Sequence, residues 1–303
     1  LRTWVHPIRC GPVTQRSADC CAVVARVDVS REQRDRTGCR GPGSVGPVDA
    51  FAAVAELPGV ADAAASARSA FDAMLWDRGL RAKSEELARR SPLAGAASSA
   101  GIDGIEVEWK VWKAGQAADD TPMGRAAAGI VALYAELPAI RPIWENAPLQ
   151  ALAKLHTLVA RPVTPDDVGR PRPDAPNDPL LLATAPDPIA VPPRLADLAL
   201  RLTRPTQAPA LVVAAIVHAE LMTMQPFTYG SGLVARAVDR LVLSSRGLDP
   251  DNWSVPEAGL QEAGRTAYAR ALRGYASGEV VAWIEFHAGA MAGGTQGLAE
   301  LAG

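Results

Sequence analysis

Residues 224–236, MQPFTYGSGLVAR, decide how this sequence is interpreted. The stretch follows one apolar run and precedes another, so it predicts a loop between two buried helices. Gly230 and Gly232 permit positive φ angles and remove side-chain bulk just before the second helix begins. The first turn of that helix presents unpaired N–H groups and the positive end of the helix dipole, with Arg236 one turn inside it. These features are compatible with an anion site, but composition alone favours an inter-helix turn with Phe227 as a core plug.

The composition of the whole chain is that of a globular protein. It has 303 residues, of which 48% are hydrophobic and 21% are charged, and its formal net charge is −2. No apolar run reaches the roughly 18 residues of a membrane span, and no secretory signal is recognisable at the N-terminus. Lysine is rare, and no Lys/Arg stripe is interleaved with aromatic residues, which argues against nucleic-acid binding. We therefore expect a cytoplasmic protein with no membrane and no nucleic-acid partner. The arginine and alanine bias favours a bacterial source.

Residues 1–47 differ from the rest of the chain in composition and in hydrophobic periodicity. They contain every cysteine, repeated Gly-Pro pairs and no sustained periodicity, and the cysteine spacings fit no paired metal-binding pattern. An amphipathic helical pattern begins abruptly at Val48. We expect residues 1–47 to be disordered and interpret them as translated upstream sequence, with Val48 as the natural start read from a GUG codon.

The remaining residues predict a nearly all-α chain. Residues 48–119 are expected to form N-terminal helices, and residues 120–303 a helical core. Thr121 followed by Pro122 indicates a helix start, and residues 254–257 form a capping-box pattern. Residues 161–193 are rich in proline and irregular, with a short β-hairpin expected around the LLLATA stretch.

The loop resembles the signature H-P-F-x-[D/E]-G-N-G-R-x-x-R of the Fic family. Five residues match at the right spacing: Pro226, Phe227, Gly230, Gly232 and Arg236. The resemblance extends over residues 120–292, where DPIAVPPRLADLAL is similar to the family's flap and the helix after it. It implies a Fic-type helical domain that transfers AMP or another phosphate-linked group from a nucleotide to a protein hydroxyl. It also implies nucleotide or phosphate binding by Phe227, Gly230, Ser231, Gly232 and Arg236.

A second resemblance lies upstream of the loop. Many Fic proteins carry an inhibitory helix with the pattern [S/T]-x-x-x-E-[G/N], and Ser99, Asp103 and Gly104 fit its spacing with Asp in place of Glu. The resemblance implies that Asp103 pairs with Arg236. A helix that simply ends with Gly104 as its cap explains the same residues.

Several departures from the signature remove reactive groups. Gln225 stands at the position of the family's general base, and a primary amide cannot accept a proton near neutral pH. Tyr229 replaces the acid that binds Mg²⁺, and Leu233 replaces an arginine that holds the outer phosphates. Ser231 in place of asparagine is a milder change, because backbone N–H groups supply much of an anion hole. We predict no metal ligands and do not expect Mg²⁺.

The histidines of the helices offer no replacement for the missing base. His218 lies seven residues before Gln225, about 10 Å along a helix, and is expected to be a packed or hydrogen-bonded histidine. His156 and His287 belong to other expected helices, and their positions in the sequence do not connect them with the loop.

The leading hypothesis is a Fic-fold pseudoenzyme or regulator that has lost AMP transfer and binds a nucleotide or phosphate weakly. ATP or another nucleotide is the candidate ligand, and no cofactor is certain. The alternative is an active adenylyltransferase, or another phosphate-group transferase, that modifies protein hydroxyls by a variant mechanism. A protein partner or target is consistent with both hypotheses, as is a purely interacting helical protein. The sequence does not indicate an oligomeric state.

Overall fold

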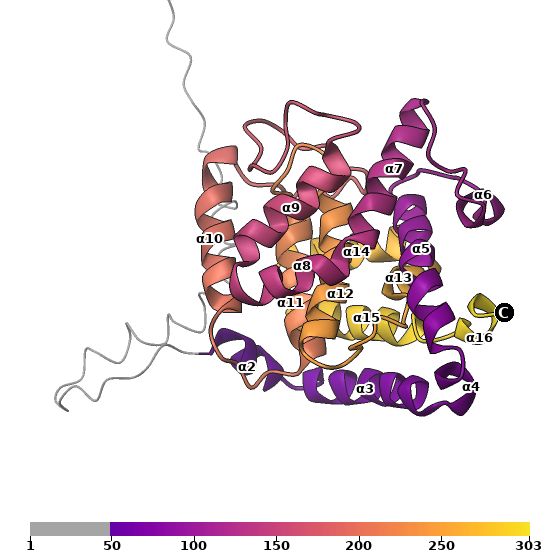
Figure 1. Ribbon diagram of the computed structural model, residues 1–303. Coiled ribbons are helices and arrows are strands. Elements are labelled where there is room, and N and C mark those ends of the chain that lie inside the picture. Colours follow the sequence, from indigo (N-terminus) through magenta and orange to yellow (C-terminus); the bar gives the residue numbers. More distant parts are fainter. Residues whose placement is uncertain (1–48) are drawn as a thin grey trace, which may run out of the picture. The chain divides into compact units, whose positions relative to one another are not determined.

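A computed structural model describes residues 49–303, which form helices joined by loops (Figure 1). The prediction for residues 1–47 falls outside this range. Within residues 49–303 there is no β-strand, so the predicted all-α class is confirmed. In chain order, the elements are α2 (Ala50–Ala55), α3 (Val60–Trp76), α4 (Arg78–Arg81), α5 (Ser84–Ile102), α6 (Trp109–Lys113), α7 (Pro122–Ala135), α8 (Leu137–Asn146), α9 (Pro148–Ala160), η2 (Pro188–Ala190), α10 (Val191–Leu202), α11 (Ala210–Met224), α12 (Ser231–Ser245), α13 (Pro256–Ala263), α14 (Arg265–Ala276), α15 (Val280–Gly293) and α16 (Leu298–Leu301).

The helices α11 and α12 form the centre of the described fold and pack against each other. The sequence of α11 is apolar on every side, so the helix is stable only when other helices surround it. It packs on α12, α14 and α15, and thirteen of its residues are buried. The loop that joins α11 to α12 is therefore anchored at both ends in the core.

The helix α5 connects the N-terminal part of the chain to this centre. It packs against α7, α12 and α13, and its C-terminal turn reaches the start of α12. The next long helix, α7, begins as predicted: Thr121 Oγ1 accepts a hydrogen bond from the Gly124 N–H at 3.0 Å. These contacts hold the predicted inhibitory segment beside the loop.

The predicted capping box before α13 is wrong. The cap residue of α13 is Val255, and its side chain makes no capping bond. Ser254 instead donates from Oγ to Asp249, and Glu257 pairs with Arg240. Both polar side chains of the motif therefore bind other side chains instead of the N-terminus of the helix.

The β-hairpin expected around LLLATA is not seen. Leu181 and Ala183 have positive φ angles of 52° and 54°, which are incompatible with a regular strand. Pro179 and Pro186 bracket the stretch and have no N–H groups to donate to a ladder. The irregular segment bonds instead to the loop between α11 and α12.

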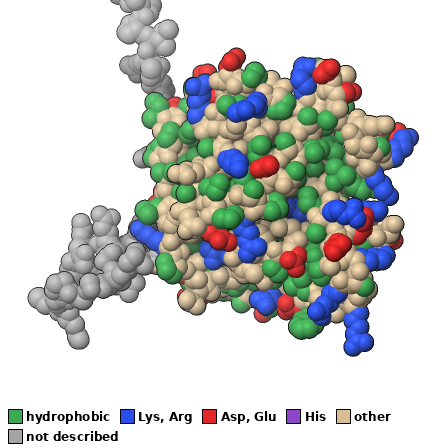
Figure 2. Space-filling view, viewed as in Figure 1, with side chains coloured by type: hydrophobic (Ala, Val, Ile, Leu, Met, Phe, Trp, Pro, Cys, Tyr) green, Lys and Arg blue, Asp and Glu red, His purple; other side chains and the backbone are tan. Residues whose placement is uncertain are grey.

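No single helix in residues 49–303 is long and apolar enough to cross a membrane, although α7 and α8 together, bent by 62°, pass that test by length and composition. On the face shown in Figure 2, acidic and basic side chains are interspersed among apolar ones.

Candidate functional site

The loop between α11 and α12 has an unusual backbone. Gln225 ends α11 in the left-handed region, with φ 44° and ψ 68°. Gly230 precedes α12 with φ 77°, and a Cβ there would lie 3.1 Å from Val159 Cγ1, so glycine is needed. Ser231 closes the loop, because its Oγ accepts from the Phe227 N–H at 3.0 Å and donates to the Phe227 carbonyl at 3.1 Å. The loop is therefore fixed by its own hydrogen bonds.

The proline-rich segment 161–187 clamps the loop from outside. The buried guanidinium of Arg172 donates to three carbonyl oxygens, those of Gln225 at 2.7 Å, Asp174 at 2.6 Å and Pro186 at 2.6 Å. Two backbone bonds join the same segments, from the Arg172 N–H to the Pro226 carbonyl and from the Asn177 N–H to the Thr228 carbonyl. Nothing in the sequence pattern pointed to Arg172, because its partners are backbone carbonyl groups, and the one in the loop is 53 residues away in the chain.

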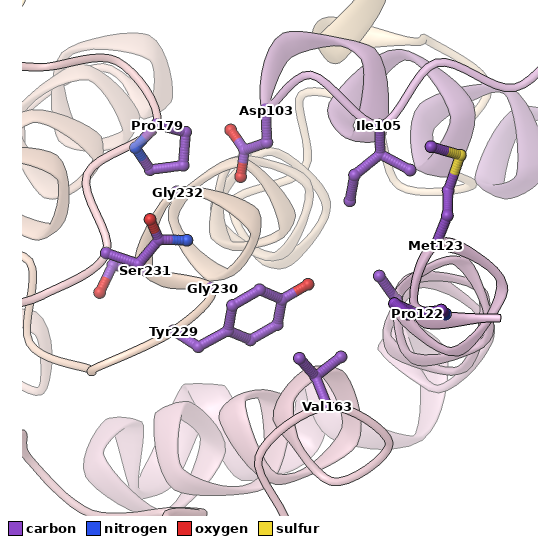
Figure 3. A pocket seen from close by; sticks show the side chains of 12 residues that line it. Asp103, Ile105, Pro122, Met123, Val163, Pro179, Tyr229, Gly230, Ser231 and Gly232 are labelled. Carbon is purple, nitrogen blue, oxygen red and sulfur yellow. The ribbon is translucent and has the colours of Figure 1, made fainter.

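A cavity of about 290 Å³ opens at the start of α12. Figure 3 shows Asp103 and Tyr229 pointing into the cavity, with Ile105, Met123 and Val163 on the side opposite Ser231. Ser231 and Gly232, the first residues of α12, line one side of the cavity, and this side is called its floor. Twelve residues line it: Asp103, Ile105, Pro122, Met123, Ala126, Val163, Asn177, Pro179, Tyr229, Gly230, Ser231 and Gly232. The cavity thus combines an apolar rim with a helix N-terminus.

Arg236 lies behind this floor and is completely buried. Its Nε donates to Ser99 Oγ at 2.7 Å, and its Nη2 donates to Asp103 Oδ1 at 2.8 Å and to the Ser99 carbonyl at 3.2 Å. Burial alone would disfavour the charge, but the neighbouring Asp103 carboxylate raises the pKa of Arg236 above its ordinary value. The structure therefore brings together Ser99, Asp103 and Arg236, as the inhibitory-helix resemblance implied.

Gly104 directly follows Asp103, the residue that caps the C-terminal end of α5. It follows α5 with φ 84°, a left-handed conformation that ends the helix as the capping interpretation requires. The Ile105 N–H then bonds to the Ala100 carbonyl at 2.9 Å. Capping by Gly104 and pairing by Asp103 are thus compatible, because different atoms perform them.

The cavity does not fit Mg²⁺. The Tyr229 phenol remains protonated, because burial and then the charge of Asp103 raise its pKa to about 12. Asp103 is the only acidic side chain among the described residues that line this cavity, and Arg236 already binds it. Leu233 is buried and does not line the cavity. Mg²⁺ usually binds one or two carboxylates besides phosphate and water oxygens, and the one carboxylate of the described lining is already paired with Arg236.

His156 is closer to the loop than its place in the sequence suggested. Its ring stacks on Phe227, with 4.0 Å between the ring centroids. Its Nδ1 accepts from the Gly169 N–H at 2.9 Å, so the proton of the neutral ring is on Nε2. Burial lowers the pKa of His156 to about 4. The earlier inference that its position is unrelated to the loop is wrong, because α9 packs directly on α12.

His218 is a hydrogen-bonded core histidine, as expected. Its Nδ1 lies 2.6 Å from Asp239 Oδ2 and its Nε2 lies 2.5 Å from the Tyr268 hydroxyl. His287 also contacts Asp239, at 3.2 Å. Within residues 49–303, one group of side chains has a spacing that would suit a metal ion: His218, Asp239 and His287, all of them buried. Because direct hydrogen bonds already join them, we interpret the group as a structural network.

Several buried polar groups at the loop and the cavity have no hydrogen-bond partner of normal geometry among the described residues. They include the side-chain amide of Gln225, which is 3% exposed, Nη1 of Arg236, and the hydroxyls of Thr228 and Tyr229. A smaller cavity of about 10 Å³ touches Gln225, Asp103, Ser231 and Gly232, and it shares several lining residues with the larger one. Groups of this kind are uncommon in protein interiors, and each one requires an explanation.

Comparisons with known proteins agree with this geometry. Residues 146–243 match the model of the Fic/DOC family. The described fold is similar to that of a Fic family protein from Desulfovibrio desulfuricans G20, with a TM-score of 0.68 and 19% identity, covering 79% of this chain and 74% of the other. It is also similar to Fic-1 from C. elegans, with a TM-score of 0.62 and 15% identity, covering 94% of this chain and 97% of the other. No curated protein matches the sequence.

Proposed function

We propose that this chain, which has the Fic fold, binds a phosphate-bearing ligand at the start of α12 and no longer transfers AMP. It acts as a pseudoenzyme or regulator. The observation that carries the proposal is Arg236, a buried cation whose Nη1 has no hydrogen-bond partner of normal geometry among the described residues. It lies beside the N–H groups at the start of α12, which have no intrahelical acceptor.

The proposed loss of transfer rests on the side chains around the loop. A hydroxyl nucleophile needs a base within hydrogen-bond reach, and Gln225 cannot accept its proton. His156 has no free lone pair, because Nδ1 accepts from Gly169 and Nε2 carries the proton. His218 uses both ring nitrogens in the core. Loss of a general base typically reduces a rate by about 10² to 10⁴.

The proposed ligand is a single phosphate-bearing group rather than a metal-bound triphosphate. Leu233 supplies no contact to an outer phosphate, and the cavity does not fit Mg²⁺. One buried guanidinium and the N–H groups of one helix turn suit one anionic group. Asp103 competes for the same guanidinium, so affinity for the ligand is reduced until Asp103 moves aside.

Calorimetry with AMP, ADP and ATP, each with and without Mg²⁺, tests the proposal. We expect AMP to bind, ATP to bind no more tightly than AMP, and Mg²⁺ to leave both affinities unchanged. No heat and no thermal shift with any of the three would refute phosphate binding.

Incubation with labelled nucleotides and a cell lysate tests the loss of transfer. We expect no labelled protein, from the wild type or from a Gln225→His variant, since Tyr229 and Leu233 remain unsuited to the reaction. Labelled proteins with the wild type would establish the alternative, a transferase with a variant mechanism.

A further inference from the structure

We propose that the side-chain amide of Gln225 is itself a ligand-binding group, which donates a hydrogen bond from Nε2 to an anionic oxygen in the cavity. The inference rests on the proposed function and deepens it. The residue at the position of the missing base then has a positive role: it holds the phosphate without removing a proton from anything.

The first observation is the state of the amide. Gln225 is 3% exposed, and neither Nε2 nor Oε1 has a hydrogen-bond partner among the described residues. An unpaired buried amide is costly, and a methionine of similar size would fill the same space without that cost. The side chain touches the small cavity that Ser231 and Gly232 also line. A polar group aimed at a cavity beside a helix N-terminus is placed to meet a ligand.

The second observation is the backbone that aims this side chain. The left-handed conformation of Gln225 is unfavourable for a residue with a Cβ. Arg172 holds it in place from the outside, through the 2.7 Å bond to the Gln225 carbonyl, and the Gln225 N–H bonds to the Leu221 carbonyl at 2.9 Å. The strained geometry is thus maintained by a buried cation from a distant segment. Its effect is to fix the starting point of the Gln225 side chain next to the cavity.

The third observation is the character of the surrounding groups. The first intrahelical bond of α12 runs from the Val234 N–H to the Gly230 carbonyl, so the N–H groups of residues 231–233 have no intrahelical acceptor. Nη1 of Arg236 lies behind Gly232, where an added Cβ would be 3.1 Å from it. Two carboxylates also line the small cavity, and both already accept hydrogen bonds: Asp103 from Arg236 at 2.8 Å and Asp178 from the Ala183 N–H at 2.9 Å. The groups left without partners there therefore include several donors, which suit a ligand that accepts. Phosphate oxygens suit this arrangement, and the amide of Gln225 supplies one more donor.

The test compares Gln225→Met with the wild type, using AMP and inorganic phosphate as probes. We expect the Met variant to keep or raise the thermal midpoint, because it removes an unpaired buried polar group, and to bind both probes about tenfold more weakly. A lower midpoint with unchanged affinities would overturn the inference and assign Gln225 a structural role only.

The charged variant Gln225→Glu gives an independent readout at nearly constant shape. A carboxylate in place of the amide would repel the anion, so we expect a loss of affinity larger than that of the Met variant. The matched control is Gln150→Glu on the exposed face of α9, which should leave both affinities unchanged. Equal or tighter binding by Gln225→Glu would contradict donation by Nε2.

The two levels of the proposal fail in different ways. A wild-type protein that binds neither AMP nor phosphate refutes the proposed function and the inference together. A wild type that binds both, with affinities that Gln225→Met and Gln225→Glu leave unchanged, refutes the inference alone.

Discussion

Two arginines one turn apart on α12 have similar surroundings but differ in the carboxylates that bind them. Arg236 donates to Ser99 and Asp103, and Arg240 donates to Ser91 and Glu257. Both side chains are buried, and both bind the hydroxyl and the carbonyl of a serine on α5. The helix α5 therefore contacts α12 through two serine–arginine contacts, eight residues apart on α5.

The two carboxylates make the difference. Glu257 binds Arg240 with both oxygens, at 2.8 and 2.9 Å, and its side chain is fully buried. Asp103 binds Arg236 with one oxygen, is 8% exposed, and lines a cavity. In the part of the chain that the structure describes, Nη1 of Arg236 has no hydrogen bond of normal geometry, whereas Arg240 places its Nε and both terminal nitrogens in hydrogen bonds. Breaking the closed pair of Arg240 and Glu257 would leave an uncompensated buried charge, whereas the carboxylate of the open pair, Asp103, lies at a cavity.

The largest effect is expected from Glu257→Gln. The change leaves the guanidinium of Arg240 buried without a counter-charge, and removal of one member of a buried pair typically costs about 3–5 kcal/mol. Urea denaturation should show this loss of unfolding free energy. A cost below about 1 kcal/mol would mean that Arg240 is solvated and that the two pairs do not differ as described.

The glycines that lie against the two guanidinium groups give a second comparison. A Cβ at Gly95 would lie 2.5 Å from Arg240 Nη2 and 2.7 Å from Glu257 Oε2, whereas one at Gly232 would lie 3.1 Å from Arg236 Nη1. We expect Gly95→Ala to destabilise the protein by about 1–3 kcal/mol, in the range of overpacked cores.

The matched variant Gly232→Ala should change stability less, because alanine favours the helix and Arg236 can shift towards the cavity. It should nevertheless weaken AMP binding measured by calorimetry. If Gly232→Ala proves the more destabilising of the two in urea, Arg236 is held as rigidly as Arg240.

Asp103→Asn should have a moderate effect in opposite directions on stability and binding. The substitution removes the counter-charge of the fully buried Arg236, but the Asn oxygen can still accept from Nη2, so we expect a cost of about 1–3 kcal/mol of unfolding free energy. Arg236 then has no competing carboxylate, so AMP should bind about tenfold more tightly, which corresponds to about 1.4 kcal/mol. Unchanged AMP affinity in calorimetry would show that Asp103 does not compete with the ligand.

The smallest effect at neutral pH concerns His156, whose contribution changes only in acid. The pKa of His156 is about 4 in the folded protein and lies below the ordinary value of 6.5, so the unfolded chain binds more protons between these values. By linkage, the stability that His156 contributes is complete above pH 6.5 and is lost as the pH falls towards 4, by at most about 1.4 kcal/mol per pH unit. His156→Gln, which keeps an acceptor for the Gly169 N–H, should flatten this part of the profile measured by thermal denaturation. A profile unchanged by the substitution would exclude His156 as the titrating group.

Part of the site could be predicted from local sequence. Gly230, Gly232 and Arg236 follow from the spacing of a loop before a helix, and Ser99 and Asp103 follow from a short pattern whose partner is a named arginine. Arg172 and the stacking of His156 on Phe227 could not be predicted, because their partners are backbone atoms and apolar rings, which leave no pattern in a single sequence. The capping box failed for a related reason: Ser254 and Glu257 are suitable for a cap, but buried partners bind them more favourably.

The sequence by itself determined the helical class, the loop between two buried helices and the absence of a base at Gln225, because periodicity and side-chain chemistry are properties of neighbouring residues. Only the tertiary structure decided which of two similar arginines is paired with a carboxylate that lines a cavity. That difference arises from where α5, α13 and the proline-rich segment meet α12. A buried charge is neutralised by the carboxylate that packing brings within about 3 Å. Glu257 binds Arg240 with both oxygens, whereas Asp103 binds Arg236 with only one.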